Sequence, residues 1–305
     1  MVAALSLAVT GGTGFVGARL LDAAAAAGHA VRALTRRAMP LRAGVTWVEG
    51  SLEDPAALAR LADGAGAVIH IAGLINGRNA AAFDACNVAG TAAMLDAARA
   101  GGAKRFVHVS SLAAREPKIS LYGASKGKSE ALVEASGLPF AIVRPPAVYG
   151  PGDRETLELF RLARMGLALL PPAGRISLIH VDDLAALLLA LADPAAPSGL
   201  LVEPDDGHAG GWSHREFAAA LGDAVGQKPL VVPVPRGLLR AAAAADALVR
   251  GDRAKLTADR AAYFSHPDWV VDPAHAVPAK LWAARLPTPA GLASTFAWYR
   301  AAGWL

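Results

Sequence analysis

The sequence predicts an α/β fold in which a doubly wound parallel sheet is joined to a smaller, mostly helical part. Over the first 150 residues, apolar runs of strand length alternate with alanine-rich segments that have helical spacing. The first apolar run, residues 5–9, leads into a glycine-rich turn at residues 10–17, and a helical segment follows at once. A strand, a glycine turn and a helix in this order open the Rossmann domains that bind dinucleotides. We therefore expect a Rossmann sheet near the N-terminus.

Beyond Gly150 the alternation gives way to helices, short strands and many prolines. A chain of 305 residues is long enough for a nucleotide-binding domain and a smaller second domain. We expect residues 1–150, with about 176–202 returning to the sheet, to form the Rossmann domain. About 151–175 and 203–305 would then form the substrate-binding part.

Caps and apolar runs predict the elements of the first half. Gly28 is a C-terminal cap for the first helix, and Asp54 with Pro55 opens another as N-cap and first residue. The apolar run at 67–72 is typical of a central parallel strand buried on both faces. The other elements expected there are strands 30–35, 45–48, 105–109 and 140–143, and helices 87–100 and 122–136.

Similar signals predict the second half. Ser213 as N-cap and Glu216 three residues later form a capping-box pattern at the start of a helix over 212–225. A histidine that starts a helix beside two aspartates, as His180 does, is more often structural than a ligand. The remaining elements expected are helices 153–165, 180–192 and 236–250, strands 176–179 and 200–203, and a loop with a strand over 263–271.

Composition excludes several classes of protein. Although 54% of the residues are apolar, no run of about 18 strongly apolar residues occurs, so we expect no transmembrane helix and no membrane partner. The N-terminus enters a strand at once without a basic region and an apolar one, so we expect no export, and a single cysteine, Cys86, fits a reducing cytoplasm. The net charge of +4 comes from scattered basic residues, which argues against nucleic acid. The histidines lack a shared ligand spacing, so we expect no metal.

The turn at residues 10–17 has the glycines that a dinucleotide site needs. Gly11 and Gly14 leave room for a pyrophosphate to approach the backbone, and Gly17 lets the helix pack closely on the first strand. The free N–H groups and the positive dipole end of the helix favour the anion. The glycine spacing here, Gly11-x-x-Gly14-x-x-Gly17, differs from the Gly-x-Gly-x-x-Gly of longer-chain dehydrogenases. The prediction of a dinucleotide site therefore depends on the position of the turn, which stands before a run of strand–helix units.

The end of the second expected strand indicates which dinucleotide binds. In folds of this kind an acidic residue there holds the adenosine ribose hydroxyls of NAD and repels the extra phosphate of NADP. This chain has Thr35 followed by Arg36 and Arg37, and guanidinium groups bind phosphate through paired N–H donors. We expect NADP to be preferred over NAD; the alternative is two solvated arginines in a loop.

Two further pairs of residues are expected to lie along the cofactor. Ser51 and Leu52 stand between a strand and a helix, where the chain should pass the adenine ring. Ala72 and Gly73 are small residues at the end of a strand, and their size would let a cofactor lie against that strand.

Tyr122 and Lys126 predict the chemical centre, because they stand at i and i+4 on one helix face. An ammonium beside the phenol is expected to lower the pKa of the tyrosine from about 10 toward working pH, so that it exchanges the proton that accompanies hydride transfer. We expect that Lys126 can also reach the nicotinamide ribose. The preceding strand delivers Ser110 and Ser111 to the edge of the sheet where ligands bind, and a serine hydroxyl there would hold the reacting oxygen.

These stretches resemble the extended short-chain dehydrogenases/reductases. This group includes NAD(P)-dependent sugar epimerases, dehydratases, and 3β-hydroxysteroid dehydrogenase-like and dihydroflavonol reductase-like enzymes. The resemblance covers nearly the whole chain and implies the fold and the cofactor class more specifically than the substrate. It is carried by residues 10–17, 87–91, 107–111, 122–126, 144–151, 180–184 and the tail from 268.

By position, the resemblance implies Ser111 as the catalytic serine, with Ser110 as the adjacent alternative, Tyr122 as the acid/base and Lys126 as its electrostatic partner. It implies also that Asn87 braces the central helix and strand near the cofactor, and that Pro145 and Val148 line the nicotinamide. The full set of expected cofactor-binding residues is Gly11, Thr13, Gly14, Phe15, Val16, Gly17, Arg36, Arg37, Ser51, Leu52, Ala72, Gly73, Asn87, Tyr122, Lys126, Pro145 and Val148.

The chain departs from the family pattern between Ser111 and Tyr122. Only ten residues separate them, fewer than in most extended members, so we expect a shorter wall of the substrate pocket. Dehydratases of the group need an acidic pair directly after the serine or threonine. This chain has Leu112 and Ala113 there, which disfavours dehydration.

We therefore predict an NAD(P)-dependent oxidoreductase that acts on a ketone or secondary alcohol. The alternatives are an NAD-dependent nucleotide-sugar epimerase and a catalytically silent cofactor-binding protein of the same fold. The substrate pocket is expected between the domains, and a homodimer through helices 87–100 and 122–136 is a family-level expectation. Basic residues that would suit an anionic substrate, or else face solvent, are Arg78, Arg115, Arg154 and Arg175.

Overall fold

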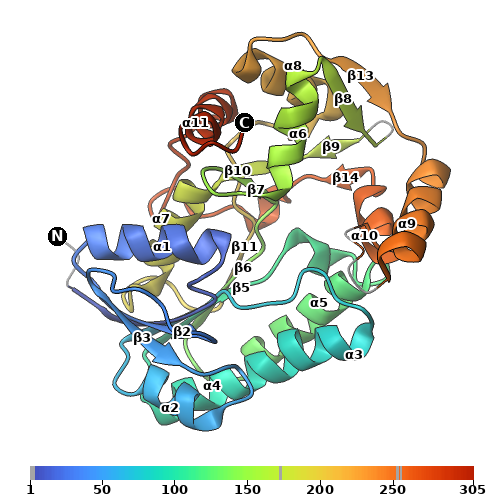
Figure 1. Cartoon of the computed structure of the whole chain (residues 1–305). Helices are drawn as coiled ribbons and strands as arrows, with labels where there is room; N and C mark the ends of the chain where they lie inside the picture. The colour runs from blue at the N-terminus through green and yellow to red at the C-terminus, as the bar shows by residue number, and fades with distance from the viewer. Residues whose placement is uncertain (1–3, 172–173, 252–253, 255) are drawn as a thin grey trace. The chain divides into compact units, whose positions relative to one another are not determined.

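The computed structural model describes residues 4–171, 174–251, 254 and 256–305 (Figure 1). The chain divides into two compact units. The first comprises the chain up to Arg144, Leu184–Glu203 and Val277–Ala283, and the second Pro145–Asp183, Pro204–Ala276 and Ala284–Leu305. Residues 145–150 and 176–183, which we expected in the Rossmann domain, group with the second unit because strand β7 there pairs with β10.

The first unit is built on a seven-stranded parallel sheet in the order β11-β6-β5-β4-β1-β2-β3. From β1, strands β2 and β3 are added toward one edge of the sheet, and β4 is then placed on the other side of β1. The direction in which successive strands are added therefore reverses between β1 and β4. Such a reversal is the switch point at which doubly wound sheets bind ligands. The strands are β1 Ser6–Thr10, β2 Ala30–Thr35, β3 Val45–Glu49, β4 Ala67–His70, β5 Arg105–Val109, β6 Phe140–Val143 and β11 Leu200–Val202.

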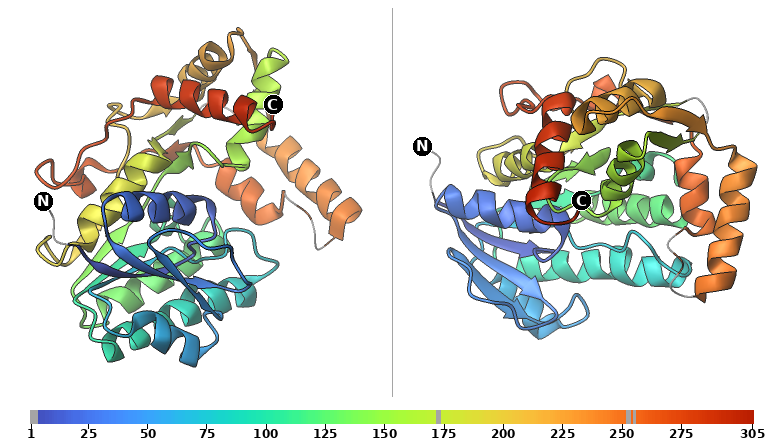
Figure 2. Two further views of the ribbon diagram at one scale, coloured as in Figure 1. Left: turned by 60° about the vertical axis from the view of Figure 1, so that its left-hand side comes forward. Right: turned by 45° about the horizontal axis from the view of Figure 1, so that its top comes forward.

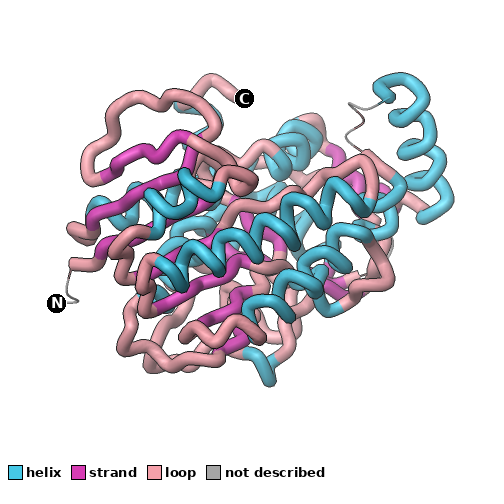
Figure 3. Tube along the Cα trace, turned by 90° about the horizontal axis from the view of Figure 1, so that it is seen from below, coloured by secondary structure: helices cyan, strands magenta, loops and turns pink. Residues whose placement is uncertain are grey.

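Helices cover both faces of this sheet. On one face α2, α4 and α5 bury a cluster that includes Leu58, Met94 and Val133 against Val68 and Phe106 of the strands. In the view from below, helices of this layer cross the strands (Figure 3), and Figure 1 shows α1 on the opposite face. The helices of this unit are α1 Phe15–Ala26, α2 Pro55–Ala62, α3 Ala80–Phe83, η1 Asp84–Ala89, α4 Gly90–Ala100, η2 Leu112–Arg115 and α5 Leu121–Glu134, and α7 Val181–Ala192 runs into it from the second unit.

Local caps set the helix ends as predicted. The Asp54 carboxylate accepts a hydrogen bond from the Ala57 N–H at 3.0 Å, with Pro55 as the first helical residue. The helix expected from residue 87 begins earlier, at Ala80, and contains a π-helical segment, Asp84–Ala89, that holds Asn87. Such π segments frequently mark functional positions in helices.

The second unit combines short sheets with helices around its own apolar core, in which Phe160, Phe217 and Tyr299 are buried. Helix α8 has the predicted capping box between Ser213 and Glu216. Helix α11, which the sequence analysis did not identify, packs against α8 (Figure 2). The elements are β7 Ala147–Tyr149, α6 Glu155–Arg164, β8 Leu167–Leu170, β9 Arg175–Ile176, β10 Leu178–His180, β12 Trp212–Ser213, α8 His214–Val225, β13 Leu230–Pro233, α9 Arg236–Arg250, α10 Ala258–Phe264, β14 Asp268–Trp269, η4 Pro273–His275 and α11 Thr288–Ala301.

Two segments of this unit differ from the prediction. The single strand expected over 176–179 is two strands, since β9 pairs with β12 and β14 while β10 pairs with β7. The loop expected from residue 263 begins inside helix α10, which the N-cap Thr257 starts. Among the described residues, no helix is both long and apolar enough to cross a membrane.

Candidate active site

Three neighbouring strands of the first unit deliver the predicted site residues to one edge of the sheet. The glycine turn follows β1, Ala72 and Gly73 come shortly after β4, and Ser110 and Ser111 follow β5. The strands lie in the order β5-β4-β1, and their carboxyl ends share this edge because the sheet is parallel. The fold thus gathers residues that are up to a hundred positions apart in the sequence.

The glycine turn has the geometry of a pyrophosphate cradle. Gly11 has a φ of +74°, and a Cβ there would lie 2.7 Å from the Ala72 nitrogen. A Cβ on Gly17 would lie 2.1 Å from the Gly11 carbonyl oxygen, so only glycine lets α1 approach the turn this closely. Helix α1 begins at the N-cap Gly14 without a side-chain cap, and Gly14 and Thr13 are exposed. These uncapped N–H donors and the helix dipole fit a dinucleotide pyrophosphate.

The arginines expected to select NADP lie just past β2 and are exposed. Thr35, at the strand end, is buried, and its hydroxyl donates to the Arg37 carbonyl at 2.7 Å, which fixes the turn that follows. In the described part of the chain, neither guanidinium has an ion-pair partner. Both groups are therefore available to an anion.

The residues expected near adenine differ from each other in their surroundings. Ser51 accepts a hydrogen bond from the Glu53 N–H at 3.2 Å. Leu52 is partly buried and packs against Gly90 of α4, where a Cβ would lie 2.7 Å from one of its methyl carbons. Leu52 therefore joins the helical layer, and a cofactor would meet only its exposed part.

The structure brings the Tyr122 and Ser111 side chains together, and Lys126 follows Tyr122 by one helical turn. Ser120 caps α5 by accepting from the Gly123 N–H at 3.0 Å, which places Tyr122 in the first turn of the helix. The Tyr122 and Ser111 hydroxyls share a hydrogen bond. One helical turn further on, the buried Lys126 ammonium donates to the Val109 carbonyl at 2.7 Å. The lysine is thus held against the end of the strand that carries the serine.

The pKa of the tyrosine shifts in the direction opposite to our expectation. Burial raises the pKa of Tyr122 above 10, and the hydrogen bond with Ser111 offsets only part of that shift. Burial also lowers the pKa of Lys126 to about 8, although the Glu130 carboxylate favours its charged form. Because the pKa of Lys126 is lowered and its ammonium already donates to a carbonyl, the lysine stabilises a Tyr122 phenolate less than the helical spacing alone suggests.

Asn87 joins three segments at the site. Its Oδ1 accepts from the Leu74 N–H at 2.6 Å, and its Nδ2 donates to the Leu74 carbonyl at 3.0 Å and to the Ser125 hydroxyl at 2.9 Å. A Cβ on Gly73 would lie 3.3 Å from the Asn87 Oδ1 and 3.9 Å from the Lys126 Nζ. The loop after β4, the π-helical segment and α5 are therefore fixed together beside the lysine.

The two candidate serines have different partners. Ser110 donates its hydroxyl proton to the Glu130 carboxylate, whereas Ser111 bonds with Tyr122 and caps η2 by accepting from the Ala113 N–H at 3.2 Å. Glu130 is held in turn by both ends of the Arg144 guanidinium, at 2.7 and 2.9 Å. The geometry favours Ser111 as the serine that faces a reacting oxygen.

Sequence reasoning missed this charged network. Glu203 accepts from Arg144 at 3.4 Å and from Arg115 at 3.2 Å, so two carboxylates and two guanidiniums alternate at the end of β6. Glu130 stands four residues after Lys126 on the same helix face, and this i, i+4 spacing of opposite charges could have predicted that Glu130 lies near the site. Glu203 gave no such signal, because its partners lie 59 and 88 positions away.

Two buried histidines, also missed, brace the strands beneath the site. His70 bonds with the Thr10 hydroxyl at 2.7 Å and the Thr91 hydroxyl at 3.1 Å, and its ring stacks on His108 at 5.6 Å between centroids. Burial lowers the pKa of His70 to about 3 and the pKa of His108 well below its usual value. Both rings are neutral at physiological pH, which indicates a structural role.

Three of the arginines considered for an anionic substrate already have partners. Arg115 pairs with Glu203, Arg154 lies over the Trp304 ring at 5.1 Å, and Arg175 donates to the carbonyls of Gly210 and Gly211. Pro145 and Val148 belong to the second unit, where Pro145 is buried and Val148 half-buried.

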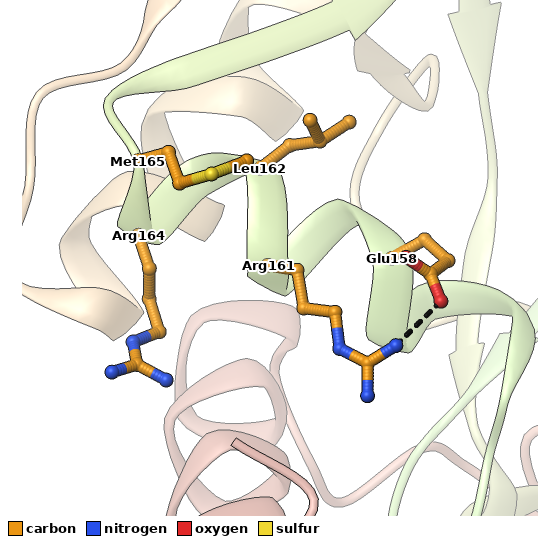
Figure 4. A pocket seen from close by; sticks show the side chains of 5 residues that line it. All are labelled: Glu158, Arg161, Leu162, Arg164 and Met165. Atoms are coloured by element: carbon orange, nitrogen blue, oxygen red, sulfur yellow. Dashed lines mark hydrogen bonds and ion pairs between the residues drawn. The ribbon is translucent and has the colours of Figure 1, made fainter.

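A hollow on the second unit is unrelated to these residues. It lies on α6 and is lined by Glu158, Arg161, Leu162, Arg164 and Met165 (Figure 4). Glu158 and Arg161 form an exposed ion pair at 2.7 Å, drawn as a dashed line in Figure 4. One helix supplies the whole lining, and none of the predicted site residues contributes to it, so we assign no function to this hollow.

Comparisons with known proteins agree with this architecture. Residues 7–199 match the model of the NAD dependent epimerase/dehydratase family. A ceramide reductase of Caulobacter vibrioides is 41% identical over 309 residues, which cover 98% of this chain and 96% of the relative. A 4-hydroxy-2-methyl-3-oxo-4-farnesyl-3,4-dihydroquinoline-1-oxide ketoreductase of Stigmatella aurantiaca is 33% identical over 262 residues, covering 77% and 78% of the two chains.

The fold is shared with solved structures at lower identity. The Bordetella bronchiseptica enzyme WbmG, solved in complex with NAD, superposes with a TM-score of 0.78 at 22% identity, covering 99% of this chain and 96% of that one. The protein is an NAD(P)-dependent oxidoreductase, as its named reductase relatives and its family model indicate. It belongs to the NAD dependent epimerase/dehydratase family, within the extended short-chain dehydrogenases/reductases.

Proposed function

We propose that this protein uses a reduced nicotinamide cofactor to reduce the ketone of a long-chain lipid of the ceramide type. The hydrogen bond between the Tyr122 and Ser111 hydroxyls beside the buried Lys126 carries the chemistry. The lipid class rests on the ceramide reductase, whose similarity extends over 98% of this chain. The ketoreductase of a farnesyl compound supports a ketone beside a long apolar chain as the shared substrate feature.

Tyr122 is the proton donor in this proposal. Because burial raises its pKa above 10, the phenol is protonated at neutral pH, which is the state that a reductase needs at the start of its cycle. The cofactor, when bound, supplies the hydride. Tyr122 gives its proton to the carbonyl oxygen, and the Ser111 hydroxyl holds the same oxygen and then the phenolate.

In this proposal, Lys126 binds the cofactor and the phenolate, and Asn87 positions the loop beside them. The ammonium donates one hydrogen to the Val109 carbonyl and keeps two further donors for the ribose of the cofactor and for the phenolate. Asn87 holds the loop at Leu74 and so keeps Gly73 open beside the lysine. Ala72, Phe15 and Val16 complete the cofactor contacts that we propose within the first unit.

NADP is the cofactor we propose to be preferred, because Arg36 and Arg37 are exposed and have no ion-pair partner among the described residues. Replacing both by alanine should weaken NADPH binding by about tenfold or more while NADH binding changes little. Fluorescence titration with both cofactors measures this preference. Equal losses for the two cofactors would contradict the assignment of the arginines to the extra phosphate.

The direct test follows nicotinamide oxidation with a long-chain ketone in detergent micelles. Tyr122→Phe should lower turnover by about a hundredfold or more and leave cofactor affinity unchanged. Ser111→Ala should lower turnover similarly, and Ser110→Ala, one residue away, is the matched control that should keep most activity. If Tyr122→Phe turns over like the natural protein, the mechanism is wrong.

The sugar epimerase alternative has its own outcome in the same experiment. It predicts NAD that stays bound through purification and interconversion of nucleotide sugars without net cofactor turnover. The occupied Arg115, Arg154 and Arg175 argue against an anionic substrate. A protein that binds cofactor without turning over any substrate would fit the silent alternative.

Two further parts of the proposal concern the setting of the protein. A homodimer through α4 and α5 is proposed from family expectation, and light scattering of the purified protein tests it. A cytoplasmic location is supported by the single free cysteine, Cys86, and cell fractionation tests it.

A further inference from the structure

Helix α9, Arg236–Arg250, presents an apolar face to solvent. Leu238, Leu248 and Val249 are 58%, 88% and 81% exposed. Successive residues of a helix are about 100° apart around its axis. On this spacing the three side chains lie with three exposed alanines within about 120° of the helix circumference. We call this set the outer face of α9; it consists of Leu238, Ala241, Ala242, Ala245, Leu248 and Val249.

Another side of the same helix packs onto the protein. Ala243 is buried, Asp246 accepts from the Leu256 N–H at 2.8 Å, and α9 lies against α10 at the margin of the second unit (Figure 1). The charged residues of α9 all lie outside the outer face. A surface helix normally turns only its polar side to water, so an exposed apolar face beside the exposed arginines of α9 is unusual.

The strand that precedes α9 in the chain also has exposed apolar residues. Leu230 and Val232 point to the same side of β13 and are 65% and 36% exposed. Val232 stands opposite Leu169 of β8, which is also exposed. Contiguous patches of exposed apolar residues mark interaction sites.

Cationic side chains lie on the flank of α9 between its packed side and the outer face, and just before β13. Lys228, Arg236 and Arg240 are exposed, and in the described ranges no carboxylate pairs with them. Arg250 is the exception in α9, because it pairs with Asp246 at 3.2 Å. An apolar helix face with unpaired cations nearby complements an anionic lipid surface.

The area of the outer face argues against a second copy of the chain as its partner. A helix of 15 residues is about 22 Å long, and a face about 10 Å wide covers about 220 Å². A stable protein interface needs about 800 Å² on each partner. A bilayer sets no such minimum, because the helix inserts its apolar side among lipid chains.

We propose that α9 and β13 dock this protein on an anionic membrane surface, where it meets a substrate that stays in the bilayer. The nature of the substrate rests on the proposed function, whereas the docking itself rests on the outer face of α9. This proposal revises the expectation of no membrane partner, which considered spanning segments alone.

Flotation with vesicles tests the docking. The protein should float with vesicles of equal parts phosphatidylglycerol and phosphatidylcholine, and bind less to pure phosphatidylcholine or at high salt. Leu248→Glu with Val249→Glu should weaken binding about tenfold or more. Leu41→Glu, which changes a fully exposed leucine of the first unit, is the matched control and should bind as the natural protein does.

The outcomes separate docking from function. Absence of flotation, or equal flotation of the double variant, overturns the docking. A dimer in light scattering that the double variant dissociates overturns it in favour of a second copy. Reduction of a water-soluble short-chain ketone should be unchanged in the double variant. Flotation without reduction of any ketone supports the docking and refutes the proposed function instead.

Discussion

Replacing Lys126 by methionine should stabilise the protein while removing its activity. The side chain is buried, and burial lowers its pKa from 10.5 to about 8. A shift of this size corresponds to about 3 kcal/mol against the charged lysine at neutral pH. Methionine has a similar length and no charge, but loses the hydrogen bond to Val109, worth about 1 kcal/mol. We expect a net gain of about 2 kcal/mol in the free energy of unfolding at pH 7.

The gain should depend on pH in a defined direction. Below pH 8 the lysine is charged in both the folded and the unfolded chain, so the folded protein bears the full cost of burying the charge. Between about 8 and 10.5 the unfolded chain binds more protons than the folded one, so the stability of the natural protein rises with pH. The advantage of Lys126→Met should therefore be largest at pH 7 and shrink toward pH 10.

Urea unfolding of both proteins without cofactor, at pH 7 and pH 10, measures this difference. Lys128→Met on the same helix is the control. Its exposed ammonium pairs with Asp84 at 2.7 Å, so its loss should change stability by less than about 1 kcal/mol. A Lys126→Met protein that is less stable at pH 7, or whose gain is the same at both pH values, would refute the reasoning.

Two further predictions concern the charged network and the glycine turn. Glu130→Gln should lower the free energy of unfolding by about 2 kcal/mol in urea titrations, because it removes the nearly buried carboxylate that binds Arg144 at 2.7 Å and leaves that guanidinium with Glu203 alone, at 3.4 Å. Asp84→Asn, at an exposed pair, should cost below about 1 kcal/mol, and equal losses would contradict this. Gly17→Ala should weaken cofactor binding about a hundredfold in fluorescence titration, since its Cβ would meet a backbone oxygen at 2.1 Å. Gly237→Ala, with nothing within 4 Å, should bind cofactor normally, and unaffected binding by Gly17→Ala would disprove the close-packing argument.

The Rossmann part of the fold was predictable because its signals are local. Strands β2, β5 and β6 begin and end where the apolar runs predicted, and Asp54 and Ser213 cap their helices as expected. A buried parallel strand must be apolar over its whole length, and a helix start needs an acceptor for its free N–H groups. Both requirements appear directly in neighbouring residues.

The second unit was harder to predict because its short strands depend on distant partners. Strand β9 has only two residues and forms between β12 and β14, where Ile176 stands opposite Trp212 on one side and Trp269 on the other. Two residues have no periodicity that a sequence reveals. The missed helix α11 buries Leu292 and Tyr299 against a core assembled from the rest of the unit.

The sequence by itself determined the glycine turn, the alternation of strands and helices, and the spacing of Tyr122 and Lys126, because each depends on residues within one strand or one helical turn. The meeting of Ser111 with Tyr122 depended on the packing of α5 beside the end of β5. The tertiary structure alone decided that Ser110 bonds with Glu130 and that Glu203 meets Arg144 across 59 positions. It also decided the direction of the Tyr122 pKa shift. Helical spacing puts a lysine near a tyrosine, but burial by the surrounding chain sets how much each charge costs.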